Sequence, residues 1–191
     1  MRRAFTHASG LSLALLLVSA AATSGEFTDP ATGFSVTVPD GFAIRPPRQD
    51  PNHETLVDIV SLTGQPPVAG RSEALCAAGF RRNPKGAIAS QDALNALPAL
   101  RNRVAEARQI LNGQGLETET VEPIQFRDFA GFEIVSIPTT GPDHRNVRIY
   151  MAIMDRVIGR TDIVCATTKQ ALPSALPVFR AIRDGTRPPT R

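Results

Sequence analysis

The sequence contains no tryptophan, one tyrosine and three histidines among its 191 residues. Sugars and nucleic-acid bases are often held by stacked aromatic rings, and such a platform is poorly supplied here. Nucleotide-binding glycine-rich loops, a Gly-x-Ser-x-Gly nucleophile elbow, calcium-loop spacing and a haem-attachment Cys-x-x-Cys-His motif are missing as well. These absences disfavour the corresponding classes of enzyme and binding protein, and they predict that the chain needs no cofactor.

Long apolar runs are missing too, and the one short run lies near the amino end. Leu11–Val18 is apolar, follows Arg2 and Arg3, and precedes the small residues Ser19–Ala22. This order predicts a signal peptide over residues 1–22, cleaved after Ala22, with Ala21 and Ser24 as alternatives. A buried helix or a membrane anchor is the competing interpretation, but the run is shorter than the roughly 20 apolar residues that span a bilayer. No cysteine follows it for lipid attachment. We therefore predict a periplasmic or secreted protein whose mature form has no membrane span.

Excess charge is lacking once the leader is removed. The whole chain has a formal charge of +3, but residues 1–22 carry two of its basic residues and none of its acidic ones. The remainder has a net charge of only +1, so the basic character does not indicate a nucleic-acid-binding protein.

Cysteine is scarce, with Cys76 and Cys165 as the only two. An even number of cysteines in an exported chain favours a disulfide. Two buried free thiols are the alternative. A zinc site made from these cysteines and two histidines would lack the close ligand pairs that zinc sites use, so no metal site is predicted.

The remaining pattern is typical of one α+β domain, residues 23–186, followed by a disordered tail over residues 187–191. Alternating apolar residues predict strands at 34–38, 56–62, 115–126, 132–137, 147–154 and 161–167, and a helix at 174–183. Residues 72–80 are interpreted as a short helix, with a strand over 74–80 as the alternative. The proline-rich segment 45–51 is expected to be an irregular connector.

A longer helix is predicted from a stripe of apolar residues at steps of three and four. Asn95 is the expected N-cap, with a possible earlier turn from Ser90 and a bend at Pro98, and Asn112-Gly113 is the expected stop. We expect the stripe to pack on the sheet and not to form a partner-binding groove. Its members are Leu97, Leu100, Val104, Ala107 and Leu111.

The segment from Phe27 to Phe42 resembles a known family. Its pattern is Phe27-x-Asp-x-x-x-Gly33-Phe34-Ser-Val-x-Val-Pro39-x-Gly41-Phe42. This is similar to the opening hairpin of the PsbP/DcrB-like domains, in which a tryptophan usually stands at the place of Phe42. The resemblance implies an α/β/α sandwich, a mostly antiparallel sheet with helices packed on it. It implies no function, because the superfamily includes photosynthetic extrinsic subunits, envelope proteins and a nuclear-transport factor.

Two segments are candidate sites. Arg81, Arg82 and Lys85 belong to a basic, turn-rich segment that is interpreted either as an anion site or as a solvated loop. His144 and Arg145, next to Asp143, lie in a predicted hairpin loop, and His53 is also expected in a loop. Asp143 beside His144 is interpreted as a polar hairpin tip, with an acid–base pair as the alternative.

The sequence therefore predicts a non-catalytic, exported accessory domain of the cell envelope that binds an unidentified protein or small molecule. The sheet face or a loop rim, with Arg81, Arg82 and Lys85 together with Asp143–Arg145, is the expected contact surface. The alternative is an enzyme whose site is assembled around Asp143, His144 and Arg145. A purely structural envelope component is a third possibility that the sequence does not separate from the first.

Overall fold

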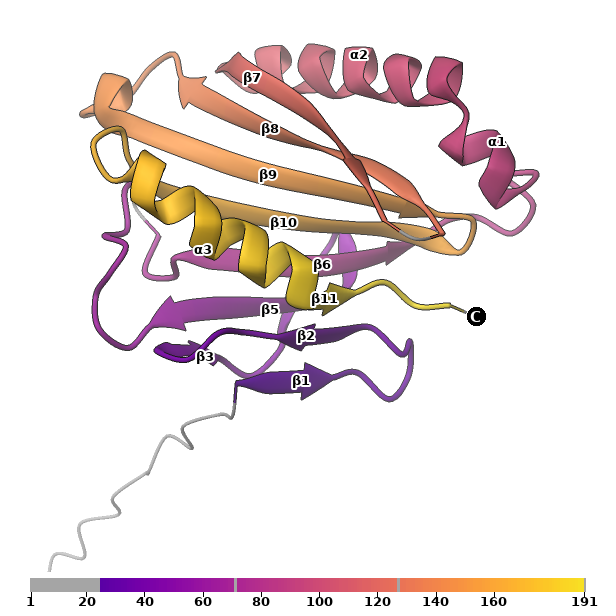
Figure 1. Ribbon diagram of the computed structural model, residues 1–191, viewed down its shortest axis with the longest axis horizontal. Helices are drawn as coiled ribbons and strands as arrows, with labels where there is room; N and C mark the ends of the chain where they lie inside the picture. Colours follow the sequence, from indigo (N-terminus) through magenta and orange to yellow (C-terminus); the bar gives the residue numbers. More distant parts are fainter. Residues whose placement is uncertain (1–24, 71, 127, 191) are drawn as a thin grey trace, which may run out of the picture.

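The computed structural model of the chain describes residues 25–70, 72–126 and 128–190. The predicted signal peptide lies outside these ranges. The described part consists of an eight-stranded antiparallel sheet, a three-stranded antiparallel sheet, and helices packed against them (Figure 1). This arrangement confirms the predicted α+β fold class. None of the helices within the described ranges is long and apolar enough to cross a membrane.

The large sheet has the strand order β3-β5-β6-β10-β9-β8-β7, and the short strand β4 pairs with β5. Strand β7 therefore lies at one edge, and β10 and β9 lie at the centre. The strands are β3 (Phe42–Ile44), β4 (Arg48–Asp50), β5 (His53–Ser61), β6 (Cys76–Arg82), β7 (Leu116–Gln125), β8 (Ala130–Pro138), β9 (Val147–Arg156) and β10 (Gly159–Thr168). The helices are α1 (Gln91–Asn95), α2 (Leu97–Gly113) and α3 (Leu172–Gly185), with a 3₁₀ turn η1 (His144–Asn146) before β9.

The small sheet joins the two ends of the described chain. Strand β2 (Ser35–Thr37) lies between β1 (Glu26–Thr28) and β11 (Thr186–Arg187). The predicted boundary between the domain and the tail, after Thr186, lies within β11. The next residues, Pro188 and Pro189, are buried. The disordered tail predicted from residue 187 is therefore wrong at its start, because pairing with β2 orders Arg187.

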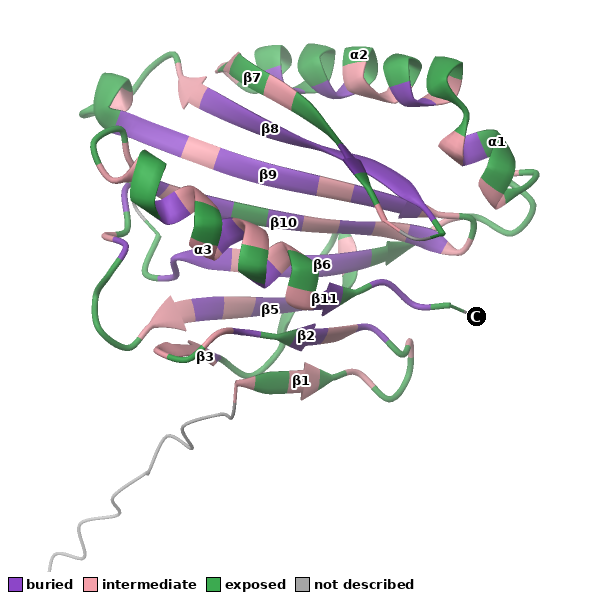
Figure 2. Cartoon of the chain, in the orientation of Figure 1, coloured by how far each residue is buried: buried purple, intermediate pink, exposed green. Residues whose placement is uncertain are grey.

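Helices α2 and α3 lie on opposite faces of the large sheet. Successive side chains of a strand point to opposite faces. On β8, the carboxylate of Glu133 accepts hydrogen bonds from Arg180 and Arg183 of α3, whereas the neighbouring Phe132 packs in the cluster that includes α2. Figure 2 shows buried residues along β8 and β9 between the two helices. The sheet is therefore the middle layer of the sandwich.

The disulfide predicted from the cysteine count is present between neighbouring strands. Cys76 of β6 and Cys165 of β10 are directly opposite one another in the antiparallel ladder and are bonded to each other. Both residues are almost completely buried in the core on the α3 face.

Two expectations from local pattern are corrected. Residues 76–82 form strand β6 and not a short helix, because this segment is hydrogen-bonded to β5 on one side and to β10 on the other. Pairing on both sides outweighs the weak helical signal of a segment rich in Ala and Gly. The connector at 45–51 is not entirely irregular, because Arg48–Asp50 pairs with β5 as strand β4.

The start of the main helix also differs from the prediction. The earlier turn is present as α1, in which the hydroxyl of Ser90 accepts a hydrogen bond from the amide of Ala93 at 3.1 Å. Asn95 is not the N-cap of α2. It ends α1, and its side chain accepts from the amide of Ala130 at 2.9 Å. Ala96 is the N-cap residue of α2 and has no polar side-chain atom, so no side-chain hydrogen bond caps this helix.

Candidate binding groove

The structure places the two predicted sets of site residues at opposite ends of the sheet. Arg81 and Arg82 end β6, where Arg82 is opposite Gly159 at the start of β10. His144 and Arg145 lie in η1, immediately before β9. The ten residues of β9 span about 33 Å between these ends, at roughly 3.3 Å per residue. The two sets therefore do not form one contact surface.

The basic segment at 81–86 is only partly a loop. The Nε of Arg82 lies 3.3 Å from Glu54, and its guanidinium lies 5.8 Å from the centre of the Phe80 ring. Arg81 and Lys85 are exposed. These contacts anchor Arg82 to the strand, and they leave no convergent set of donors for an anion.

The hairpin tip is held by hydrogen bonds to the backbone. The Nδ1 atom of His144 lies 3.0 Å from the carbonyl oxygen of Gly141, and the guanidinium of Arg148 donates to the carbonyl of Arg145 at 2.9 Å. Within this described turn, no hydrogen bond joins His144 to Asp143. His144 and Arg145 line an open hollow of about 370 Å³ at the end of the sheet, together with Arg148 and Lys169.

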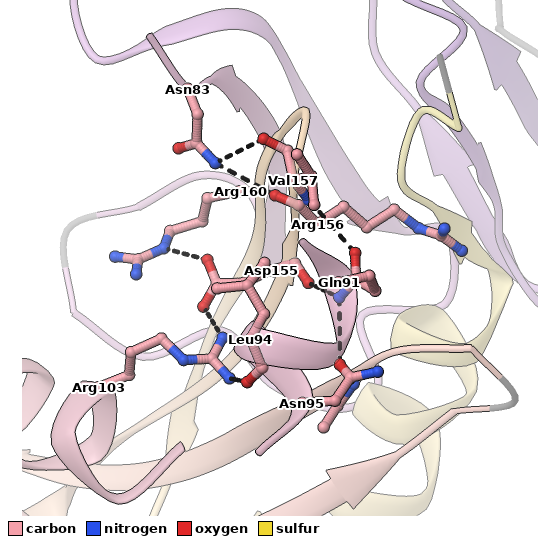
Figure 3. Close-up of polar contacts among 10 residues, drawn as sticks. Asn83, Gln91, Leu94, Asn95, Arg103, Asp155, Arg156, Val157 and Arg160 are labelled. Carbon is pink, nitrogen blue, oxygen red and sulfur yellow. Dashed lines mark hydrogen bonds and ion pairs between the residues drawn. The ribbon is translucent and has the colours of Figure 1, made fainter. Parts of the chain in front are cut away.

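A buried carboxylate fixes the position of α2 on the sheet (Figure 3). Asp155 of β9 is 4 % exposed and binds two arginines, Arg103 of α2 and Arg160 of β10. Arg103 also donates to the carbonyl of Leu94 at 2.7 Å. Burial on its own would lower the pKa of Arg160, but the charge and hydrogen bond of Asp155 outweigh it and raise this pKa. The result is a charged centre that ties α1 and α2 to the central strands.

A hollow of about 790 Å³ lies beside this centre. Gln91 and Arg156, two polar side chains in its wall, are bound within the protein. Gln91 donates to the carbonyl of Asp155 and accepts from the amide of Val157, and Arg156 pairs with Asp128 at 2.7 Å. Figure 3 shows Gln91 and Asn95 turned toward one another and toward the β9–β10 turn. The wall connects α1 to this turn and presents few free groups to a ligand.

A mainly apolar hollow of about 420 Å³ forms a groove between α2 and the edge strand β7, which we call the α2–β7 groove. Its floor includes the fully buried ring of Phe132 and the nearly buried Leu100. Leu97 lies at its rim with 67 % of its surface exposed. The lining residues are Leu97, Leu100, Arg101, Val104, Ala105, Arg108, Val121, Pro123 and Phe132.

The predicted apolar stripe of α2 is therefore only partly a packing surface. Leu100, Ala107 and Leu111 are buried against β8 and β9, as expected. Leu97 is not buried, because the chain turns sharply at Ala96 and Leu94 of α1 occupies a buried place instead. The expectation that this stripe packs on the sheet is confirmed except at Leu97.

Two arginines on the groove rim have no acidic partner in the described ranges. Arg101 and Arg108 are exposed and lie seven residues apart on the same flank of α2. Arg103, two residues from Arg101, is by contrast bound to Asp155. An apolar floor with cationic groups at its edge can hold an apolar surface that carries negative charge.

A second polar cluster was not found from the sequence. The Nδ1 atom of His53 lies 2.9 Å from Asp50, and its Nε2 atom lies 2.9 Å from Asp162. The predicted loop position of His53 is wrong, because it begins strand β5. The hydrogen bond that His53 donates to Asp162, opposed by burial, raises the pKa of His53. Since both ring nitrogens are occupied by carboxylates, this histidine connects β4, β5 and β10 and has no free nitrogen for a substrate.

The sequence gives only weak signals for the α2–β7 groove and for the contact between His53 and Asp162. The free flank of α2 is marked by Arg101 and Arg108 at a seven-residue spacing, but only the position of β7 makes it a groove. Asp162 is 109 residues from His53, so their contact has no local signal. In the described part of the chain, no group of three or more His, Cys, Asp or Glu residues is arranged to hold a metal ion.

Comparison with solved structures places the fold among PsbP-like domains. The solution structure of the cyanobacterial PsbP protein, CyanoP, from Synechocystis superimposes with a TM-score of 0.58 at 12% sequence identity, covering 90% of this chain and 95% of that one. A crystal structure of a protein of unknown function from Pseudomonas aeruginosa matches with a TM-score of 0.46 at 11% identity, covering 82% of this chain and 92% of that one. No protein-family model and no curated protein sequence matches the chain. The PsbP-like fold implied by the opening hairpin is thus confirmed, and this likeness concerns the fold alone.

Proposed function

We propose that this chain is an exported, non-catalytic binding domain that holds a partner in the α2–β7 groove. The observation that carries the proposal is the combination of an apolar floor, an exposed Leu97 and two arginines on one rim without acidic partners among the described residues. A groove of about 420 Å³ falls within the range of ordinary ligand sites.

The non-catalytic part of the proposal is supported by how the described ionisable side chains are used. His53 is held between two carboxylates, and Asp155 and Glu133 are each bound by two arginines. A general base or nucleophile needs a free site that faces its substrate. These groups instead stabilise the packing of strands and helices.

Export is supported by the leader pattern of residues 1–22 and by the disulfide. The bond joins Cys76 to Cys165 between two neighbouring strands of the core. Structural disulfides persist in oxidising compartments such as the periplasm. A periplasmic or secreted location is therefore part of the proposal.

The groove is tested with 8-anilinonaphthalene-1-sulfonate, a small apolar probe that carries one negative charge. The oxidised mature protein should bind it at one saturable site and shift the amide NMR signals of α2 and β7. Leu97→Asp, and the pair Arg101→Glu with Arg108→Glu, should each weaken binding, whereas Arg81→Glu, on strand β6 and outside the groove lining, should not. Shifts centred on His144, or no saturable binding, would overturn the groove assignment.

The catalytic alternative is tested separately. Mature protein would be assayed against a broad panel of hydrolase substrates alongside His144→Ala. We expect no turnover above background. Turnover that disappears in His144→Ala would instead assign an enzymatic site to Asp143, His144 and Arg145.

A further inference from the structure

We infer that the occupant of the α2–β7 groove is an amphipathic α-helix of a partner protein, with acidic residues beside its apolar stripe. This inference rests on the proposed function and adds the chemical class of the partner. It follows from the shape of the free flank of α2, from the charge on that flank, and from the edge of β7.

The free flank of α2 has the spacing of a helix-packing surface. Leu97, Arg101, Ala105 and Arg108 follow one another at steps of four, four and three, which places them along one side of the helix. They span twelve residues, or about 16 Å along the helix axis. Rows of side chains with this spacing form the ridges and grooves into which a second helix packs. The small side chain of Ala105, between the two arginines, leaves room for close approach.

The charge on this flank is positive and uncompensated among the described residues. Arg101 and Arg108 are separated by seven residues, or about 10 Å along the helix axis. Glu122 belongs to β7, which forms the other side of the groove, but it does not neutralise these arginines. Its side chain is paired with Arg180 of α3, on the other face of the sheet. Two acidic residues seven positions apart on a partner helix would match the spacing of the two arginines.

The edge of β7 is unsuited to the main alternative, an extended peptide that adds a strand to the sheet. Pro123 has no amide hydrogen to donate, and the pairing of β7 shifts register between Thr118 and Thr120. Glu117 adds a negative charge along the same strand, whereas Glu119 is paired with Arg148. Proline, irregular register and charge are the features by which natural edge strands resist added strands. A helix, which brings its own hydrogen bonds, does not depend on this edge.

The inference is tested with three synthetic peptides of about 18 residues. The first has leucines at steps of three and four and two glutamates seven residues apart on the flank of this stripe. The second replaces both glutamates with lysine. The third is the first peptide with one central residue replaced by proline, which breaks the helix. Affinities are measured by titration calorimetry at low and at physiological salt.

We expect wild-type protein to bind the glutamate peptide about tenfold more tightly than the lysine peptide, with the difference smaller at high salt. Arg101→Glu with Arg108→Glu should reverse this preference, which a merely misfolded variant would not do. Leu97→Asp should weaken both helical peptides, since Leu97 is exposed and its replacement leaves the core intact. The proline peptide should bind weakly to every variant.

Equal affinity for all three peptides, or no peptide binding, would overturn the helical partner. Self-association of the chain through the groove, detected by analytical ultracentrifugation and lost in Leu97→Asp, would overturn it in favour of a second copy. If the sulfonate probe occupies the groove and no peptide does, the groove remains a binding site for small amphiphiles and only this inference fails. If neither binds, the proposed function fails too.

Discussion

The imidazole of His53 on β5 reaches across the intervening strand β6 to the carboxylate of Asp162 on β10, with Nε2 2.9 Å from Oδ1. The contact depends on Gly79 of β6. A Cβ atom at this position would lie 2.4 Å from Cδ2 of His53, which is closer than real Cβ contacts allow. Because Gly79 of β6 has no side chain, His53 of β5 and Asp162 of β10 can form an ion pair across this strand.

His53 should make stability depend on pH. Its pKa is raised in the folded protein, chiefly by the hydrogen bond to Asp162, so protonated His53 stabilises the native state. This contribution is fully present below the unfolded pKa, about 6.5, and is lost as the pH rises through the folded pKa. We expect the Tm of wild-type protein to fall across this range and His53→Gln to show a flatter profile. Equal slopes for the two proteins would contradict the assignment.

Asp50 should act at the acid end of the same cluster. Its pKa is lowered in the folded protein, first by the hydrogen bond to His53. The stabilisation is therefore present above the unfolded pKa, near 3.8, and is lost as the pH falls through the lowered folded value. Asp50→Asn should remove this part of the acid-induced loss of stability, as followed by circular dichroism between pH 5 and about pH 2.

Gly79→Ala should displace the His53 ring and break its contact with Asp162. We expect a loss of about 1–3 kcal/mol in the free energy of unfolding, typical of an overpacked site, and a weaker pH dependence of Tm above pH 6. Gly113→Ala is the matched control, because no atom lies within 4 Å of its added Cβ and its backbone is not left-handed. That variant should be neutral or slightly more stable. Unchanged stability in Gly79→Ala would mean that the ring moves aside at no cost.

Asp155→Asn should loosen α2 and with it the groove. The substitution keeps the shape of a side chain that is 4 % exposed but removes the charge that Arg103 and Arg160 share. Breaking a buried ion pair typically costs about 3–5 kcal/mol. Urea unfolding measures this loss, and binding of the sulfonate probe should weaken in parallel. Asp128→Asn, which removes an exposed partner of Arg156, should cost less than about 1 kcal/mol.

The disulfide and the leader are checked together by the intact mass of the native protein. We expect a chain that begins at Thr23, lighter by two hydrogens than its reduced form, that resists alkylation until it is reduced. Reduction should lower the free energy of unfolding by about 2–5 kcal/mol, because the bond closes a long loop between residues 89 positions apart. A full-length chain with two alkylatable thiols would reject both the export and the oxidised state.

Much of the fold could be predicted from local sequence. The strands at β2, β5, β7, β8, β9 and β10 and the helix α3 carry clear periodicity, and Gly33, Pro39 and Gly41 mark turns in an opening hairpin that resembles the PsbP-like one. The pairing of Cys76 with Cys165 was predicted from an even number of cysteines in a chain with a predicted leader. Periodicity and turn residues are local features, and two cysteines allow only one pairing, so one sequence is enough to predict them.

Other features were decided only by tertiary structure. Segment 76–82 becomes a strand because β5 and β10 pair with it on both sides, although its small residues also suit a helix. His53 meets Asp162 because strands far apart in sequence become close neighbours, and Gly79 leaves space between them. The groove exists because the chain turns at Ala96 and leaves Leu97 outside the core beside an edge strand. The sequence by itself determined the periodicity of the strands and helices and predicted the pairing of the two cysteines. The contacts between side chains of distant segments depended on tertiary packing, which a local pattern does not encode.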